Sequence, residues 1–163
     1  MLKSPALLGA IPDVSVGATA PATEAVDLDG KKVTLAGHRG KVVVLDFWHT
    51  TCGPCIRMVP RANALVKELK GRPFVQVGVS VDPSREKVRA FLERTEMPWA
   101  HWWVGGTSRA LEAWDVEGYP TVYVIDHEGV IRHRRVGFDA ATDDLHDIVH
   151  ALVEKAEAAK GAK

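Results

Sequence analysis

The chain has 163 residues, of which 46% are hydrophobic and 26% charged, and its 21 basic side chains equal its 21 acidic ones. This length supports one domain with a substantial core. Because the net charge is zero and no apolar run approaches the roughly 18 residues of a membrane span, we expect neither nucleic-acid binding nor a transmembrane segment.

Residues 1–22 are rich in Pro, Ala and Gly and lack periodicity, which predicts an extended N-terminal arm before a single domain over residues 23–160. The opening MLKSPALLGAIP has one Lys and a short apolar patch, a weak pattern for a signal peptide. We therefore expect either a cytoplasmic chain or a trimmed form whose export signal is missing.

The next segments predict a hairpin, a buried strand and a helix. DLDGKKVTL indicates a turn at Asp29-Gly30 followed by a short strand through Val33 and Leu35. KVVVLDFW, residues 41–48, is typical of a central strand buried on both faces. A helix is expected from the Cys-Gly-Pro-Cys segment to Lys70, with Gly71 just past its end.

Strand and helix patterns alternate over the rest of the chain. The alternation predicts an α/β fold with a central mixed sheet flanked by helices. Both cysteines stand where the first buried strand ends and its helix begins, which is where open α/β sheets place their sites. The expected elements are a strand at 74–81, a helix after Ser84, a short strand around HWWV, a helix at 108–114, a hairpin of TVYVID and GVIRHRRV, and a helix at 143–159.

The segment HTTCGPCIRMVP holds the only two cysteines, Cys52 and Cys55. A disulfide that closes so short a loop constrains the unfolded chain little, so the pair indicates chemistry. The unpaired N–H groups and dipole of a helix start stabilise a thiolate, and Gly53-Pro54 turns the chain into that helix. We therefore predict Cys52 as the nucleophile and Cys55, one turn inside, as the thiol that resolves a mixed disulfide.

Three alternatives for the pair are structural zinc, covalent haem and an inert disulfide. Zinc needs a second pair of ligands, and none is evident, although His49 and the two cysteines offer three ligands facing different directions. Haem attachment needs His after the second Cys, where Ile56 stands. We expect no metal and no cofactor.

DFWHTTCGPCIRMVP resembles the active-site segment of thioredoxin-like proteins. The wider pattern, from Gly17 to the last helix and including GYPTVYVIDHEGVIRHRRVGF, resembles the TlpA/ResA branch of thiol–disulfide oxidoreductases. The resemblance implies a thioredoxin-like fold with an N-terminal hairpin extension and protein disulfide or dithiol substrates. We expect a monomer. It also implies an upstream thiol protein that donates or accepts electrons, and an extracytoplasmic location, often for cytochrome c maturation.

The resemblance extends to individual residues. Pro120 matches the family's cis-proline, so the Tyr119–Pro120 backbone would bind an extended substrate segment; the alternative is an ordinary turn proline. Asp46 stands within VVVLDFW, where burial should raise its pKa. In thioredoxins the matching acid helps deprotonate the resolving Cys through water; the alternative is a carboxylate satisfied by backbone donors at a strand end.

Other residues near the pair complete the expected substrate surface. Trp48 is expected beside the dithiol, together with Gly53 and Pro54, although a plain core role fits Trp48 equally well. His49 would favour the Cys52 thiolate if it were protonated and close, but an exposed loop histidine is the commoner outcome. Thr51 departs from the thioredoxin pattern, which has Trp before the first Cys, and so leaves the partner open.

The leading prediction is an enzyme that reduces or exchanges protein disulfides, with the direction of electron flow open. A peroxidase is one alternative, because peroxiredoxins share this fold, but they carry a Pro and a Thr or Ser before the peroxidatic Cys. Here His49 stands three residues before Cys52 and no Pro precedes it in the segment. A copper-handling module is the other alternative, but related copper chaperones space their cysteines by three residues and add a distant His.

Overall fold

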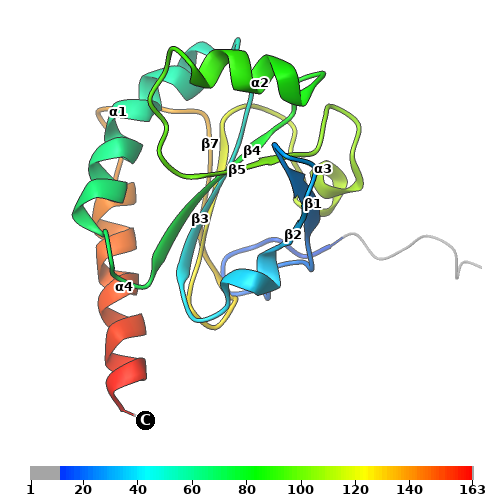
Figure 1. Cartoon of the computed structure of the whole chain (residues 1–163). Helices are drawn as coiled ribbons and strands as arrows, with labels where there is room; N and C mark the ends of the chain where they lie inside the picture. Colours follow the sequence, from blue (N-terminus) through cyan, green and yellow to red (C-terminus); the bar gives the residue numbers. More distant parts are fainter. Residues whose placement is uncertain (1–11, 163) are drawn as a thin grey trace, which may run out of the picture.

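The alternating pattern forms a seven-stranded mixed sheet in the computed structural model, which describes residues 12–162 (Figure 1). Its three central strands, β3 (Val42–Trp48), β4 (Phe74–Ser80) and β5 (Ala100–Trp103), run parallel. On one side β6 (Thr121–Ile125) and β7 (Ile131–Val136) join antiparallel, and on the other side the hairpin of β1 (Glu24–Asp27) and β2 (Lys32–Thr34) does so. The α/β, thioredoxin-like class with its N-terminal hairpin is therefore confirmed. In sheet order the strands are β2, β1, β5, β4, β3, β6 and β7.

The strand β3 lies at the centre of the core, and all seven of its residues are buried. Its alternate side chains face opposite sides of the sheet. Val42 and Val44 pack with α1 and α4, whereas Val43, Leu45 and Phe47 pack on the other face with residues such as Trp102 and Trp114. Figure 1 shows α1 and α4 together on one side of the sheet. The helices are α1 (Gly53–Glu68), α2 (Arg85–Leu92), α3 (Arg109–Ala113) and α4 (Leu145–Gly161).

The β1–β2 hairpin forms at the predicted turn and adds two strands to the β5 edge. The Asp27 carboxylate accepts the backbone N–H groups of Asp29 and Lys31 at 2.8 and 2.9 Å, and Gly30 takes a positive φ of 83°. The prediction that this strand runs through Leu35 is wrong by one residue. β2 ends at Thr34 because its hydroxyl accepts from Gly37 N and caps a short 3-10 helix, Leu35–His38.

Two predicted helix boundaries also shift. The first helix ends at Glu68, not Lys70, and Gly71 follows at a φ of 80°. The last helix begins at Leu145, not at 143. Asp143 precedes it as a loop residue whose carboxylate pairs with Arg61 and Arg135 and accepts from Leu145 N.

Residues 12–22 lie against the domain but are not extended throughout, because Ala18 N donates to the Ser15 carbonyl at 3.0 Å in a turn. Val14 is buried in the core, and the backbone of Gly17 and Ala18 bonds to Ile131 at the start of β7. Ala20 N also donates to the Gly129 carbonyl at 2.9 Å. The first half of the expected arm, residues 1–11, lies outside the described residues. Within residues 12–162, no helix combines the length and apolar character needed to cross a membrane.

Candidate active site

The two cysteines form a disulfide at the start of α1, with an S–S distance of 2.07 Å. Cys52 is the N-cap residue of α1, and its Sγ accepts the backbone N–H of Cys55 at 3.2 Å. Pro54 lies in the first turn, where backbone N–H groups have no partner within the helix, so its lack of an N–H costs no hydrogen bond. That turn contains no acidic residue. This end of the helix therefore favours negative charge on the Cys52 sulfur.

The disulfide packs into an apolar cluster that includes Trp48, Val59 and, partly buried, Tyr119. Trp48 is 1% exposed and so lies both beside the dithiol and in the core, which combines the two roles considered for it. Cys52 and Cys55 are 5% and 3% exposed. Burial thus barely distinguishes the two cysteines. Their positions do, because Cys52 is the N-cap of α1 and Cys55 lies inside the helix.

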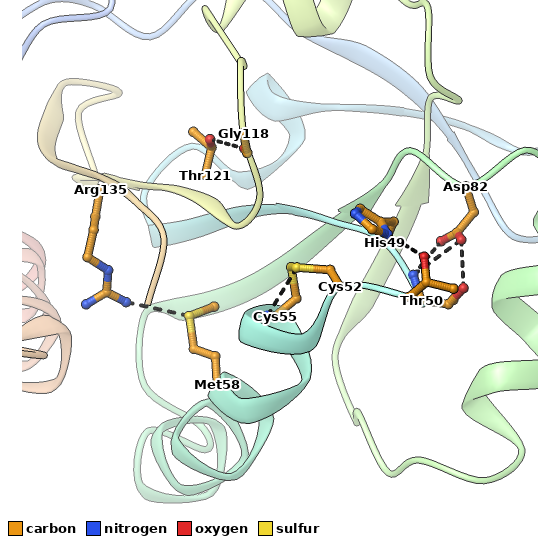
Figure 2. The surroundings of a disulfide bond; sticks show 10 residues. His49, Thr50, Cys52, Cys55, Met58, Asp82, Gly118, Thr121 and Arg135 are labelled. Carbon is orange, nitrogen blue, oxygen red and sulfur yellow. Dashed lines mark hydrogen bonds between the residues drawn. A yellow bond between two sulfur atoms is a disulfide. The ribbon is translucent and has the colours of Figure 1, made fainter. Parts of the chain in front are cut away.

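The loop before Cys52 is fixed by Asp82, a residue that sequence reasoning missed (Figure 2). Thr50 donates to the Asp82 carboxylate through its backbone N–H at 3.1 Å and its hydroxyl at 2.7 Å. Ser80 Oγ also donates to this carboxylate, at 2.8 Å, and Asp82 is 2% exposed. The signal available in the sequence was an acid directly after the strand FVQVGVSV. Asp82 thereby holds the end of β3 relative to the end of β4.

His49 lies in the loop before Cys52, and its ring contacts Tyr119. The two rings meet edge to face with centroids 5.2 Å apart, and His49 Nδ1 lies 3.0 Å from Thr51 Oγ1. His49 is half-buried, whereas Thr51 is exposed. The imidazole therefore connects the loop before Cys52 with the segment before Pro120.

The Tyr119–Pro120 peptide bond is cis, as the resemblance implied. Thr121 Oγ1 donates to the Gly118 carbonyl at 2.7 Å and holds this segment at the start of β6 (Figure 2). The Pro120 carbonyl accepts from Gly137 N at 2.8 Å, but the Tyr119 backbone makes no backbone hydrogen bond within residues 12–162. Of the two residues expected to bind substrate, Tyr119 thus has free backbone groups and Pro120 does not.

Asp46 is buried in β3, on the face covered by α1 and α4. It is 4% exposed, and its Oδ1 has no hydrogen-bond partner among the described residues, which contradicts the alternative that backbone donors satisfy it. Burial raises the pKa of Asp46 to about 7, an effect that the positive charge of Arg135 partly opposes. The carboxyl group can therefore accept and release a proton near neutral pH.

Arg135 is the second residue that sequence reasoning missed. Asp46 pairs with Val122, which pairs with Arg135, so the three residues form one row across β3, β6 and β7 and face the same side. The guanidinium donates to Asp143 and, at 3.5 Å, to the sulfur of Met58, one turn after Cys55 (Figure 2). Although Arg135 stands among other basic residues on β7, IRHRRV, its own side chain is only 17% exposed.

The sheet order, the cis peptide bond and the cysteine pair at a helix start define a thioredoxin-like protein with a redox-active dithiol. A family model described as Redoxin matches residues 15–152. The chain belongs to the Redoxin family.

Curated relatives and solved structures agree with this assignment. The chain is similar to the thiol-disulfide oxidoreductase ResA of Geobacillus kaustophilus, with 34% identity over 73% of this chain and 68% of that protein. It is also similar to the thioredoxin-like protein YneN of Bacillus subtilis, with 33% identity over 76% and 73% of the two chains. The thioredoxin domain of a thiol-disulfide oxidoreductase from Bacteroides vulgatus superposes with a TM-score of 0.76 at 28% identity, and the match covers 86% of this chain and 99% of that one. The chain is accordingly a thiol–disulfide oxidoreductase.

Proposed function

We propose that Cys52 is the nucleophile that attacks a disulfide in a substrate protein and that Cys55 resolves the resulting mixed disulfide. The Cys52 thiolate forms a bond to one substrate sulfur and expels the other as a thiolate, which takes up a proton. Cys55 then attacks Cys52 Sγ and releases the second substrate thiol, leaving the Cys52–Cys55 disulfide. Two electrons have passed to the substrate, and a second thiol protein restores the reduced pair.

The observation that carries this proposal is the capping geometry of Cys52. Its sulfur accepts an N–H group at the first turn of a sixteen-residue helix, where an anion is stabilised. Cys55 lies within the helix, buried and beside the same sulfur, and is placed to attack only after Cys52 has formed a mixed disulfide.

Asp46 is proposed as the proton acceptor for Cys55. A resolving thiol must lose its proton before it attacks, and an acceptor whose pKa lies near 7 does this efficiently at neutral pH. Asp46 lies beneath α1 on the sheet face that the helix covers, so a water molecule would relay the proton between the two groups.

The substrate is proposed to be an extended protein segment that bonds to the Tyr119 backbone as an added strand. Two exposed apolar residues near the dithiol and the cis-proline support this choice: Ile56 follows Cys55, and Val136 lies beside Gly118. These residues are 37% and 56% exposed. Gly53 and Pro54 would form the edge of the same surface, and the buried Trp48 would support it from below. Segments of this kind occur in proteins that are unfolded or have flexible loops.

We propose further that the protein acts as a monomer outside the cytoplasm, in the periplasm or tethered to a membrane, with a cytoplasmic role as the alternative. The similarity to proteins named ResA supports this location and a role in cytochrome c maturation. In either compartment its partners would be substrate proteins and an upstream thiol protein that donates or accepts electrons.

Single serine variants test the two cysteine roles. Cys52→Ser should no longer accelerate the reduction of insulin by dithiothreitol, because the nucleophile is gone. Cys55→Ser should accumulate covalent complexes with substrate that thiols release, and the double variant, as control, should trap nothing. Full dithiol-dependent turnover by Cys52→Ser would show that the nucleophile is wrongly assigned.

A further inference from the structure

A cluster of three metal-binding side chains lies at the end of α1 that is remote from the dithiol. Glu68 is the last residue of α1, and His146 and His150 lie one turn apart on α4. Glu68 Oε2 is 2.7 Å from His146 Nε2 and 3.0 Å from His150 Nε2. One ligand atom from each residue lies within 4.8 Å of the other two, so the three side chains converge on one point.

The geometry of the cluster is close to that of a zinc site. Zinc binds imidazole nitrogen and carboxylate oxygen at about 2.0–2.2 Å, which places tetrahedral ligands about 3.4 Å from one another. The ion would therefore fit if side-chain rotation moved each ligand atom outward by less than about 1 Å. The side chains of Glu68, His146 and His150 are 45%, 55% and 26% exposed, so an ion can reach them from solvent.

The donor set and its surroundings suit a divalent transition metal. Two imidazoles and a carboxylate match Zn²⁺, Ni²⁺ or Cu²⁺ better than the oxygen-seeking Mg²⁺ or Ca²⁺. Asp147 Oδ1 lies 3.2 Å from His146 Nδ1. A carboxylate in this position accepts the Nδ1 proton, so Nε2, which faces Glu68 in this structure, is the nitrogen that would bind the metal in place of its proton.

We propose that Glu68, His146 and His150 form a zinc site that joins the end of α1 to α4, with water completing the coordination. The site is independent of the dithiol, because Glu68 lies about 24 Å from Cys52 along the helix at 1.5 Å per residue. Since the unfolded chain does not hold these ligands together, bound zinc would stabilise the folded protein.

The test uses tag-free protein in its disulfide form, because thiolates bind zinc and the disulfide sulfurs do not. Competition with a chromophoric chelator should show one Zn²⁺ per chain. His146→Gln and His150→Gln should each weaken binding at least about tenfold, because each removes one of three ligands. His127→Gln, a histidine at the β6–β7 turn, is the matched control and should bind as the wild type does.

Thermal unfolding gives the second readout. Added Zn²⁺ should raise the midpoint of the wild type and of His127→Gln by equal amounts and that of His150→Gln by a clearly smaller amount. The proposal is overturned if the wild type binds no zinc at about 100 µM free metal, where a micromolar site would be filled. It is also overturned if zinc binding is equal in the wild type and both site variants.

Discussion

Replacing Asp46 with Asn should stabilise the protein at alkaline pH, although the substitution lies in the core. The wild-type carboxylate must ionise in a site where it is 4% exposed and where its Oδ1 has no hydrogen-bond partner. Asn has nearly the same shape and never ionises. The variant therefore removes the desolvation penalty of a buried carboxylate from the free energy of folding.

The magnitude follows from the pKa of Asp46, which burial raises from 3.8 to about 7. Each pH unit between the folded and unfolded values corresponds to about 1.4 kcal/mol, so the full penalty is about 4 kcal/mol. Burial of the new amide offsets part of it, which leaves a gain of about 2–4 kcal/mol for Asp46→Asn at pH 8.5.

The sign of the pH dependence is fixed by the same shift. Below pH 3.8 the carboxyl group is neutral in both states and carries no penalty. Between pH 3.8 and 7 the folded protein binds more protons than the unfolded chain, so wild-type stability falls as the pH rises. Above about 7 the penalty is complete and constant.

Urea unfolding of the oxidised proteins at pH 4, 6 and 8.5 measures these changes. The free energy of unfolding of Asp46→Asn relative to the wild type should rise by about 4 kcal/mol between pH 4 and pH 8.5, because the cost of burying the amide does not depend on pH. A variant that is equally stable or less stable at pH 8.5, or a difference that does not vary with pH, would refute the assignment of a raised pKa to Asp46.

Two further substitutions test the surroundings of the dithiol. Arg135→Gln should raise the pKa of Asp46 further and move the pH profile of disulfide reduction upward by about one pH unit, whereas Arg132→Gln should leave it unchanged; equal profiles would show that Arg135 does not act on Asp46. Asp82→Ala should lower the free energy of unfolding by about 2 kcal/mol, because the Thr50 N–H and hydroxyl lose their buried acceptor, and Asp82→Asn should lose less. A urea midpoint for Asp82→Ala equal to that of the wild type would contradict this.

Local sequence signals were enough to predict the main elements of the fold. The run KVVVLDFW became the fully buried β3, and Ser84 caps α2 with its hydroxyl accepting from Lys87 N at 3.3 Å. These signals succeed because they rest on neighbours within a few residues. The start of α4 was less predictable, because Asp143, just before it, pairs with Arg61, which lies 82 positions earlier in the sequence.

The candidate site divides in the same way. The cysteine pair and the buried acid were visible in short motifs, since their chemistry depends on a helix start and on one apolar strand. The hydrogen bonds of Thr50 with Asp82 join residues 32 positions apart, and the row from Asp46 to Arg135 runs across three strands. These contacts arise because β3 pairs with β4 and with β6, and no single segment of the sequence shows which strands pair.

The central claim is that the cap of α1 holds the Cys52 sulfur as an anion. The most direct measurement is the pH dependence of the alkylation rate of reduced Cys55→Ser protein, which keeps the backbone N–H that Cys52 accepts. We predict that the rate reaches half its maximum well below the value of free cysteine, about 8.5. A midpoint at or above 8.5 would contradict the account.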